Sequence, residues 1–374
     1  MMKIAIDTRD LKKGKTGTYT YLDSLSKAFK LTPKDKGVSF MFIHYPLPVY
    51  NGSLFIGKFF EHLLFTIWKQ IVIPIYCCVN KIDLLFCTDY FLPLVKMKTK
   101  KAVVFHDAFF YEEPWHYNTL WLKSFHWIAV RAAKKADLVI VPTNYVKNRL
   151  SFFIPQLAHK IKVVYEGPQQ IETGLQDQVW NKEIADWLSG SPFILHVGTL
   201  DYRKNLIRLI ESYEILMQKN IDIKIIIAGD SPKYFSSNGK NAIQQTIKER
   251  NLNERIKLTG RVSEFQLDYL YKTAHLYVFP STNEGFGLPM VEAMKYRLPI
   301  AASNNTALPE VGGNAAIYFD PTNTEDIANK IGLLIADEHV RQRLKEAAGE
   351  RMHLFDWQKS SDQLIQYFIQ TNNK

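Results

Sequence analysis

Two carboxylates, Glu284 and Glu292, enclose the segment of the chain with the most evident chemistry. Between them lie Gly285, Phe286, Gly287, Leu288 and Pro289, directly after an apolar run. Glycine permits positive φ, and proline suits a first helical turn, so the segment predicts a tight turn into a helix. The free N–H groups of such a helix start bind phosphate. Carboxylates on both sides add acceptors for sugar hydroxyls, which favours a nucleotide sugar. The alternative is a strand–turn–helix with solvated glutamates.

A second candidate site lies near the start of the second half of the chain. Gly198 follows an apolar run, and Arg203 and Lys204 come before a helical pattern. The two cations could neutralise a diphosphate, arginine through paired hydrogen bonds and lysine as a point charge. The alternative is ordinary solvation of a helix start.

Further polar residues or glycines stand where other strands are expected to end. Gly17 lies in a basic loop with glycines, and His106 with Asp107 ends a buried run. These two places suit phosphate or acceptor binding, although a plain loop and a structural histidine are the alternatives. Gly229 ends another run, and the Gly260-Arg261-Val262 segment is placed to meet a nucleobase through its backbone.

The sequence lacks the motifs of metal binding, dinucleotide binding and disulfide frameworks. The sequence contains no His-x-x-x-His, Cys-x-x-Cys or Asp-x-Asp pattern, so we expect no metal and no cofactor beyond the donor substrate. No Gly-x-Gly-x-x-Gly follows the first run of either half, which excludes a dinucleotide dehydrogenase. Three cysteines do not form a disulfide framework, so a cytoplasmic, reducing compartment is expected.

The elements that must position these residues alternate along the chain. Near-continuous apolar runs predict buried parallel strands, and the longer patterns between them predict helices. The expected strands are 3–8, 38–45, 82–87, 102–106, 138–142, 161–165, 193–198, 223–229, 256–258, 276–280, 300–303 and 316–319. The expected helices are 19–29, 58–76, 118–136, 144–151, 180–188, 206–218, 242–250, 264–274, 288–296, 325–336 and 356–369. This order predicts an α/β fold with two doubly wound parallel sheets in succession.

The length of 374 residues also favours two domains. We expect an N-terminal domain over 1–170, a second domain over 171–355, and a C-terminal helix over 356–374 that returns to the first domain. The boundary is set by residues 166–192, which carry Gly-Pro and Ser-Gly-Ser-Pro and little apolar periodicity.

Positive charge is concentrated in the first half of the chain. The net charge is +10, and residues 1–170 carry 24 Lys+Arg against 12 Asp+Glu. No nucleic-acid-binding signature accompanies this excess, so an anionic membrane surface or an anionic substrate is the expected partner. A solvated basic surface is the alternative. A transmembrane helix is not expected, because Lys69 and Pro74 interrupt the best apolar run.

Taken together, these motifs resemble the retaining GT-B-fold glycosyltransferases often called family four. The resemblance covers nearly the whole chain and is strongest over 192–321. It is carried by Val197–Asn205, Ala228–Asp230, Leu258–Ser263, Val278–Ser281, Glu284–Ala293, Leu308–Gly313 and Tyr318–Pro321. The family's Glu-x7-Glu spacing is matched by Glu284 and Glu292. Where the family often has an arginine after the strand-end glycine, this chain has Thr199, and Arg203 is the candidate substitute.

The resemblance implies a role for each of these residues. Glu284 would contact the donor sugar, Glu292 the ribose, and the backbone of Phe286–Leu288 the sugar and phosphate. Lys204 with Arg203 would hold the diphosphate. Gly17 would lie near the phosphates and the acceptor, and His106 near the reacting sugar.

The reaction implied is transfer of a hexose, with retention, from a GDP- or UDP-sugar to a glycan or lipid-linked acceptor. It would serve bacterial cell-surface polysaccharide or glycolipid synthesis at the inner face of the cytoplasmic membrane. A GT-B epimerase or hydrolase and a catalytically inactive binding subunit are the alternatives.

Overall fold

The computed structural model describes residues 1–12, 16–50, 55–117, 119–169, 178–231 and 239–373. Within these residues the chain divides into two units. One comprises Met1–Gly167 with Asp356–Lys374, and the other comprises Pro168–Phe355. Each unit has its own sheet and its own apolar core.

The N-terminal unit is built on a six-stranded parallel sheet of order β2-β1-β3-β4-β5-β6. The strands are β1 (Met2–Asp7), β2 (Val38–Ile43), β3 (Leu84–Cys87), β4 (Lys100–Val104), β5 (Leu138–Val141) and β6 (Ile161–Val163). Strand order reverses between β1 and β3, and such a switch point opens a crevice at the carboxyl ends of the strands.

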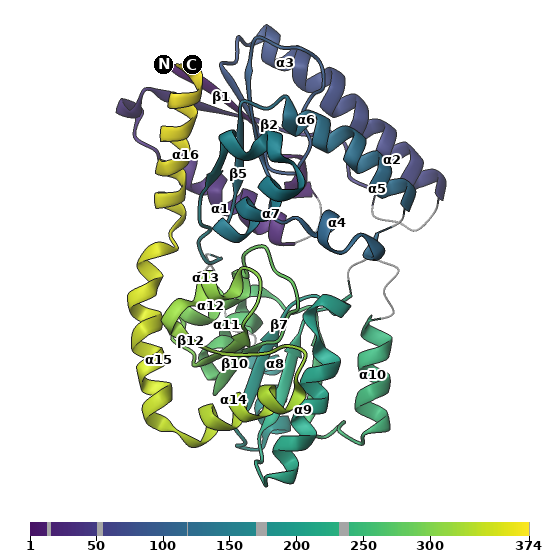
Figure 1. Cartoon of the computed structure of the whole chain (residues 1–374), viewed down its shortest axis with the longest axis vertical. Helices are drawn as coiled ribbons and strands as arrows, with labels where there is room; N and C mark the ends of the chain where they lie inside the picture. The colour runs from purple at the N-terminus through teal and green to yellow at the C-terminus, as the bar shows by residue number, and fades with distance from the viewer. Residues whose placement is uncertain (13–15, 51–54, 118, 170–177, 232–238, 374) are drawn as a thin grey trace. The chain divides into compact units, whose positions relative to one another are not determined.

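Helices cover this sheet. They are α1 (Gly17–Lys30), α2 (Phe55–Ile67), α3 (Ile73–Val79), α4 (Phe109–Glu112), α5 (Thr119–Phe125), α6 (Arg131–Lys134), α7 (Asn144–Phe153) and α16 (Trp357–Asn372). The π-helical turns η3 (Trp68–Val72) and η5 (His126–Val130) join α2 to α3 and α5 to α6, and the 3-10 turns are η1 (Arg9–Lys12), η2 (Lys34–Lys36), η4 (Pro114–His116) and η6 (Pro155–Lys160). The C-terminal helix α16 runs beside α1 (Figure 1), and its Phe368 ring lies 5.1 Å from that of Phe86 in β3.

The helix expected over 58–76 is confirmed and is somewhat longer. It continues from α2 through η3 to α3, past both Lys69 and Pro74. Lys69 turns into the interior, and Pro74 stands in the first turn of α3, next to the π-helical turn. A local π-turn accommodates the missing N–H without ending the helix.

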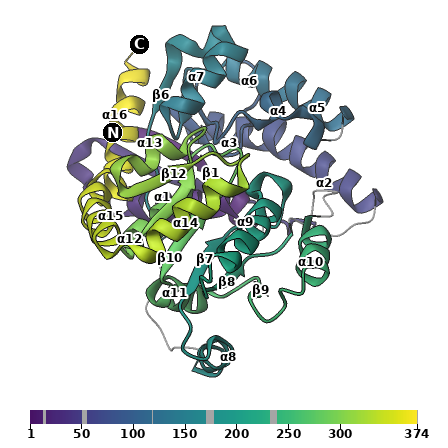
Figure 2. The same cartoon turned by 60° about the horizontal axis from the view of Figure 1, so that its bottom comes forward.

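The C-terminal unit has a second six-stranded parallel sheet, of order β12-β11-β10-β7-β8-β9 (Figure 2). Its strands are β7 (Phe193–Val197), β8 (Lys224–Ala228), β9 (Ile256–Gly260), β10 (Leu276–Phe279), β11 (Ile300–Ser303) and β12 (Ala316–Phe319). This is the strand order of a dinucleotide-binding Rossmann sheet, with the switch point between β7 and β10.

The helices of this unit are α8 (Gln178–Leu188), α9 (Leu206–Gln218), α10 (Gly239–Glu249), α11 (Glu264–Thr273), α12 (Leu288–Lys295), α13 (Leu308–Gly312), α14 (Thr324–Ala336) and α15 (Glu338–Arg351). The short turns are η7 (Tyr202–Lys204), η8 (Gly313–Ala315) and η9 (Met352–Leu354). All the expected strands are confirmed within a few residues, but α13 and α15 were not expected. Helix α15 is highly charged and buries only Leu344, Ala347 and Ala348, so its apolar pattern is weak.

Candidate functional site

The candidate site lies in the C-terminal unit at its switch point, where β7 and β10 end side by side. The chain leaves β7 through Gly198 into η7, and it leaves β10 through Pro280 to Glu284 before α12. The two loops are joined by a backbone hydrogen bond, because the N–H of Thr282 donates to the carbonyl of Arg203 at 2.8 Å. The fold therefore brings together two motifs that are about 80 residues apart in the sequence.

A buried ion pair occupies this junction. The Lys204 Nζ donates to Glu284 Oε1 at 2.5 Å, and the two side chains are only 10% and 11% exposed. The ammonium also lies 5.3 Å from the centre of the Phe279 ring. A pair in such surroundings interacts more strongly than one in water, because few solvent dipoles screen it.

Lys204 is held in place by its neighbours. Asp201 caps η7 by accepting from the N–H of Arg203 at 3.0 Å. Asn205 follows in the left-handed conformation, with φ of 56°, and its amide donates to the carbonyls of Pro280 and Pro321 at 3.0 and 2.8 Å. The lysine thus stands on a short turn that hydrogen bonds fix at both ends.

Arg203 takes a different direction from Lys204. Its Nε and Nη2 both lie 3.5 Å from the carboxylate of Asp201. Burial works to raise the pKa of Asp201, but Arg203, Lys204 and the hydroxyl of Thr199 lower it below its ordinary value. In this structure the Glu284 carboxylate is paired with Lys204, while the Arg203 guanidinium neutralises Asp201.

Three glycines line the ends of neighbouring strands beside Lys204. The N–H of Gly198 donates to the Ala228 carbonyl at 3.0 Å, and the N–H of Gly229 donates to the Gly260 carbonyl at 2.8 Å. Gly229 has φ of +141°, and a Cβ there would lie 1.8 Å from the Gly198 carbonyl oxygen. No other residue fits at that position. Arg261, next to Gly260, is exposed, and Val262 is half-buried.

The turn between Glu284 and α12 is closely packed. Gly287 has φ of 98° at the start of the helix, where a Cβ would lie 2.9 Å from Leu308. Gly285 does not have a positive φ. Phe286 is buried against Phe355, so its side chain supports the turn and only its backbone is available to a ligand.

Glu292 is buried on the second turn of α12. It accepts from the hydroxyl of Tyr271 at 2.9 Å. Burial raises the pKa of Glu292 to about 7, although the hydrogen bond from Tyr271 and the charge of Lys295 act in the opposite direction. A carboxyl with such a pKa ionises near neutral pH and favours added hydrogen-bond donors, such as sugar hydroxyls.

Two residues of this site were missed from the sequence. His196 in β7 is fully buried, donates through Nδ1 to the Val278 carbonyl at 3.0 Å, and leaves Nε2 without a hydrogen-bond partner. Burial lowers the pKa of His196 to about 4, so the ring is neutral. Tyr271 holds Glu292. Neither belongs to a sequence motif, and only the tertiary structure reveals them.

The two remaining predicted residues, Gly17 and His106, belong to the N-terminal unit. Gly17 is the first residue of α1, and a Cβ there would meet no atom within 4 Å. The His106 Nε2 lies 2.9 Å from the Thr88 carbonyl, and its Nδ1 lies 3.5 Å from Glu166 Oε1. Burial works to lower the pKa of His106, but Glu166 raises it above its ordinary value. Contact of either residue with a donor stays a prediction.

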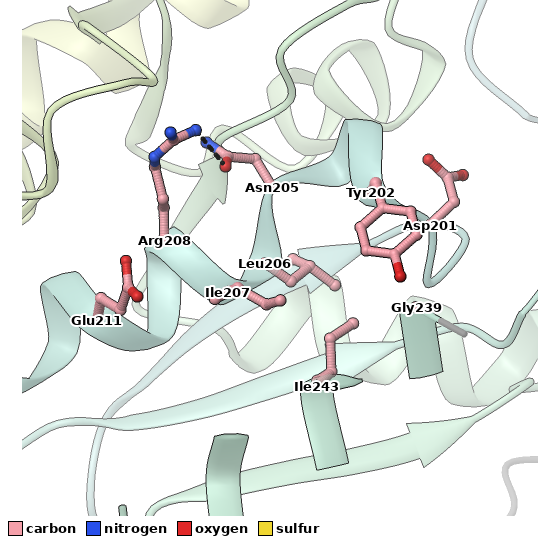
Figure 3. Close-up of a pocket in the computed structure, with 9 residues that line it drawn as sticks. All are labelled: Asp201, Tyr202, Asn205, Leu206, Ile207, Arg208, Glu211, Gly239 and Ile243. Atoms are coloured by element: carbon pink, nitrogen blue, oxygen red, sulfur yellow. Dashed lines mark hydrogen bonds between the residues drawn. The ribbon is translucent and has the colours of Figure 1, made fainter. Parts of the chain in front are cut away.

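A pocket of about 320 Å³ lies beside the candidate site, at the start of α9 (Figure 3). Leu206, Ile207 and Ile243 lie between the polar pair Asp201 and Tyr202 and the pair Arg208 and Glu211 (Figure 3). Its remaining residues are Asn205 and Gly239. None of the predicted donor-binding residues is among those that line this pocket.

Among the described residues, Asp7, Cys87 and Asp89 are close enough to share a metal ion. The ammonium of Lys69 already lies 2.6 Å from both carboxylates. Burial raises the pKa of the Cys87 thiol, which favours its protonated form beside this ion pair. We therefore interpret this group as a buried ion network.

Two Rossmann-like units, one of which carries a cation and two carboxylates at its switch point, define an α/β protein of the GT-B type. Residues 180–351, most of the C-terminal unit, match the family "Glycosyl transferases group 1". The O-antigen chain mannosyltransferase B of Escherichia coli is 30% identical over 179 residues, which are 48% of this chain and 46% of that protein. The chain thus spans about half the length of this curated relative.

Solved structures extend the likeness in fold to the whole chain. The sucrose-phosphate synthase of Thermosynechococcus elongatus has a TM-score of 0.76 at 17% identity, over 99% of both chains. Anabaena Alr3699/HepE in complex with UDP-glucose has a TM-score of 0.69 at 18% identity, over 98% of this chain and 99% of that one. At these identities the likeness shows the fold alone.

Proposed function

We propose that the chain is a retaining glycosyltransferase that moves a hexose from a UDP- or GDP-sugar to an acceptor hydroxyl in cell-surface polysaccharide or glycolipid synthesis. The observation that carries this proposal is the buried pair of Lys204 and Glu284 at the switch point of the C-terminal sheet. The names of similar proteins, a mannosyltransferase and a structure with bound UDP-glucose, support the substrate class.

Each group has a distinct part in the proposed reaction. An ammonium has three N–H donors, so Lys204 can keep Glu284 and also hold an oxygen of the leaving diphosphate. Glu284 accepts from hydroxyls of the transferred sugar, and Glu292 accepts from the ribose. Charge that develops on the leaving phosphate is stabilised by Lys204 and by the N–H groups at the start of α12, without a metal ion. The leaving phosphate takes the acceptor proton on the same face.

The test distinguishes the contribution of this ion pair to stability from its role in the reaction. Lys204→Met or Glu284→Gln strands the buried partner, so each single variant is expected to lose stability. The double variant removes both charges and is expected to recover most of that stability. Donor turnover is expected to fall at least about 100-fold in all three variants. Without Lys204 the charge on the leaving group is not neutralised, and without Glu284 the hydroxyls of the transferred sugar lose their charged acceptor.

The measurements are donor consumption with each of the nucleotide sugars, together with thermal unfolding with UDP and with GDP. Lys257→Met is the matched control, because Lys257 pairs with Glu183 at 3.1 Å on the surface of the same unit. Turnover retained in the folded double variant would refute the roles of both residues. Donor hydrolysis or epimerisation that no acceptor accelerates would refute glycosyl transfer.

A further inference from the structure

The helix of the N-terminal unit that runs through α2, η3 and α3 has an inverted distribution of polarity. Its outward side chains are apolar, and they include Phe59, Leu63, Ile67, Ile71, Ile75 and Val79, which are between 38% and 73% exposed. Surface helices of soluble proteins normally place charges outward and apolar residues inward. An apolar stripe of this length therefore needs an explanation other than core packing.

Two charged side chains of this helix, Lys69 and Glu61, point into the protein instead. Lys69 is 1% exposed and lies 2.6 Å from both Asp7 and Asp89, at the ends of β1 and β3. Burial works to lower its pKa, but the two aspartates raise it, so the lysine stays charged. About two turns earlier, Glu61 forms an ion pair with Arg9, whose guanidinium is also buried.

These contacts fix the orientation of the helix. The indole N–H of Trp68 also donates to Asp7, at 3.0 Å. Of the described residues, Phe59–Val79 is long and apolar enough to cross a membrane by length and composition. Spanning would pull Lys69 and Trp68 away from the sheet and leave Asp7 unpaired in the interior, which is costly. The helix therefore lies along the surface of its unit.

The neighbouring helix supplies positive charge. Phe91 contacts both Phe65 of α2 and Phe125 of α5, so the two helices pack on a common residue. Residues 119–136, which form α5, η5 and α6, contain Lys123, Arg131, Lys134 and Lys135 and no acidic residue. These cations are exposed, and Trp127, 56% exposed, lies 4.9 Å from the guanidinium of Arg131.

We propose that the outward face of Phe59–Val79 docks the chain on an anionic lipid surface, with the helix in the plane of the interface and the cations of residues 119–136 near the headgroups. An exposed apolar stripe gains from the acyl boundary, tryptophan is favoured at the interface, and each cation adds attraction to anionic lipid. A second copy of the chain fits this surface less well, because two basic surfaces repel. The inference does not depend on the proposed transfer reaction, since lipid binding is measured without donor or acceptor.

The experiment is flotation of the purified full-length chain with vesicles of phosphatidylcholine alone or mixed with phosphatidylglycerol. We expect flotation with the anionic vesicles and a decline as salt is raised. The variant Ile67→Gln/Ile71→Gln/Ile75→Gln is expected to lose binding by about tenfold or more. The matched control is Met217→Gln/Phe265→Gln/Leu333→Gln, which removes three apolar side chains of the other unit that are 37–41% exposed. It should bind like the wild type.

Two further measurements distinguish the alternatives. Cys78 is exposed on this helix whereas Cys77 and Cys87 are buried, so a maleimide fluorophore reports from Cys78 and should shift to the blue on anionic vesicles. Bound chain should exchange into fresh vesicles, and failure to exchange would instead indicate a spanning helix. Equal flotation of the apolar variant, or no flotation of the wild type, would overturn the proposal. A dimer that this variant converts to monomer, without lipid binding, would assign the surface to a second copy.

Discussion

Glu292→Gln is expected to stabilise the unliganded chain at alkaline pH while it weakens donor binding. The wild-type carboxyl is buried, and burial raises its pKa from 4.5 to about 7. Its hydrogen bond from Tyr271, at 2.9 Å, does not fully offset the loss of water. Glutamine keeps the size of the side chain and an oxygen that can accept from the same hydroxyl.

The sign of the effect follows from proton binding. Between pH 4.5 and about 7 the folded chain holds a proton at Glu292 that the unfolded chain has lost, so wild-type stability falls as pH rises through this window. The full difference amounts to about 3 kcal/mol above pH 7. Glutamine does not titrate, so the advantage of the variant should be small at pH 5 and should approach that figure at pH 8. The tyrosines whose pKa Glu292 raises, Tyr271, Tyr277 and Tyr296, stay protonated over this pH range in both proteins.

The assay is thermal and urea unfolding of both proteins at pH 5 and pH 8, without nucleotide. We expect the unfolding temperature of the variant to exceed that of the wild type by several degrees at pH 8 only. Addition of UDP or GDP should then stabilise the wild type more than the variant, because a carboxylate accepts from ribose hydroxyls more strongly than an amide. Glu254→Gln, at an exposed position of the same unit, is the control. An equal shift at both pH values, or a less stable variant at pH 8, would refute the burial argument.

Two further predictions concern Gly229, at the end of β8, and His106 of the N-terminal unit. Gly229→Ala should lower the free energy of unfolding by more than about 3 kcal/mol or prevent folding, because its Cβ would lie 1.8 Å from a carbonyl oxygen. Gly190→Ala, at φ of +79° with no atom within 4 Å of its Cβ, should lower it by about 1 kcal/mol in the same urea unfolding. Comparable losses in the two variants would contradict the steric argument. Glu166→Gln should lower the pKa of His106 in an NMR titration of its imidazole protons, since Glu166 raises that pKa. A raised histidine pKa stabilises the fold below pH 6.5, and this contribution is lost as pH rises through the folded pKa. The free energy of unfolding of this variant should therefore fall further below that of the wild type at pH 6 than at pH 9. An unchanged His106 titration would show that Glu166 does not act on the ring.

Much of the architecture could be read from local sequence patterns. Each strand of both sheets is a short apolar run with few charges, and each stands between turn residues. Parallel strands are buried on both faces, so their runs are nearly continuous and easy to recognise. Helix α15 has no comparable signal, since half of its residues are charged and it buries only one leucine and two alanines.

The motifs of the candidate site were also evident, but their contacts were not. Strand-end glycines and the Glu-x7-Glu spacing marked Gly198, Gly260, Glu284 and Glu292. Nothing in the linear order indicated that Lys204 pairs with Glu284 while Arg203 turns to Asp201. The direction of a side chain depends on neighbours from other elements.

Residue type and spacing therefore determined the fold class, the family resemblance and the strand ends that carry the site. Only the tertiary structure decided which of those residues meet, because strands distant in sequence become neighbours at a switch point. It also showed that Lys69, a charge within an apolar run, turns inward to two aspartates. Burial of that charge leaves the apolar face of its helix exposed. The sequence gives the order of residues along a helix, but only the tertiary structure shows which face of that helix packs against the rest of the protein.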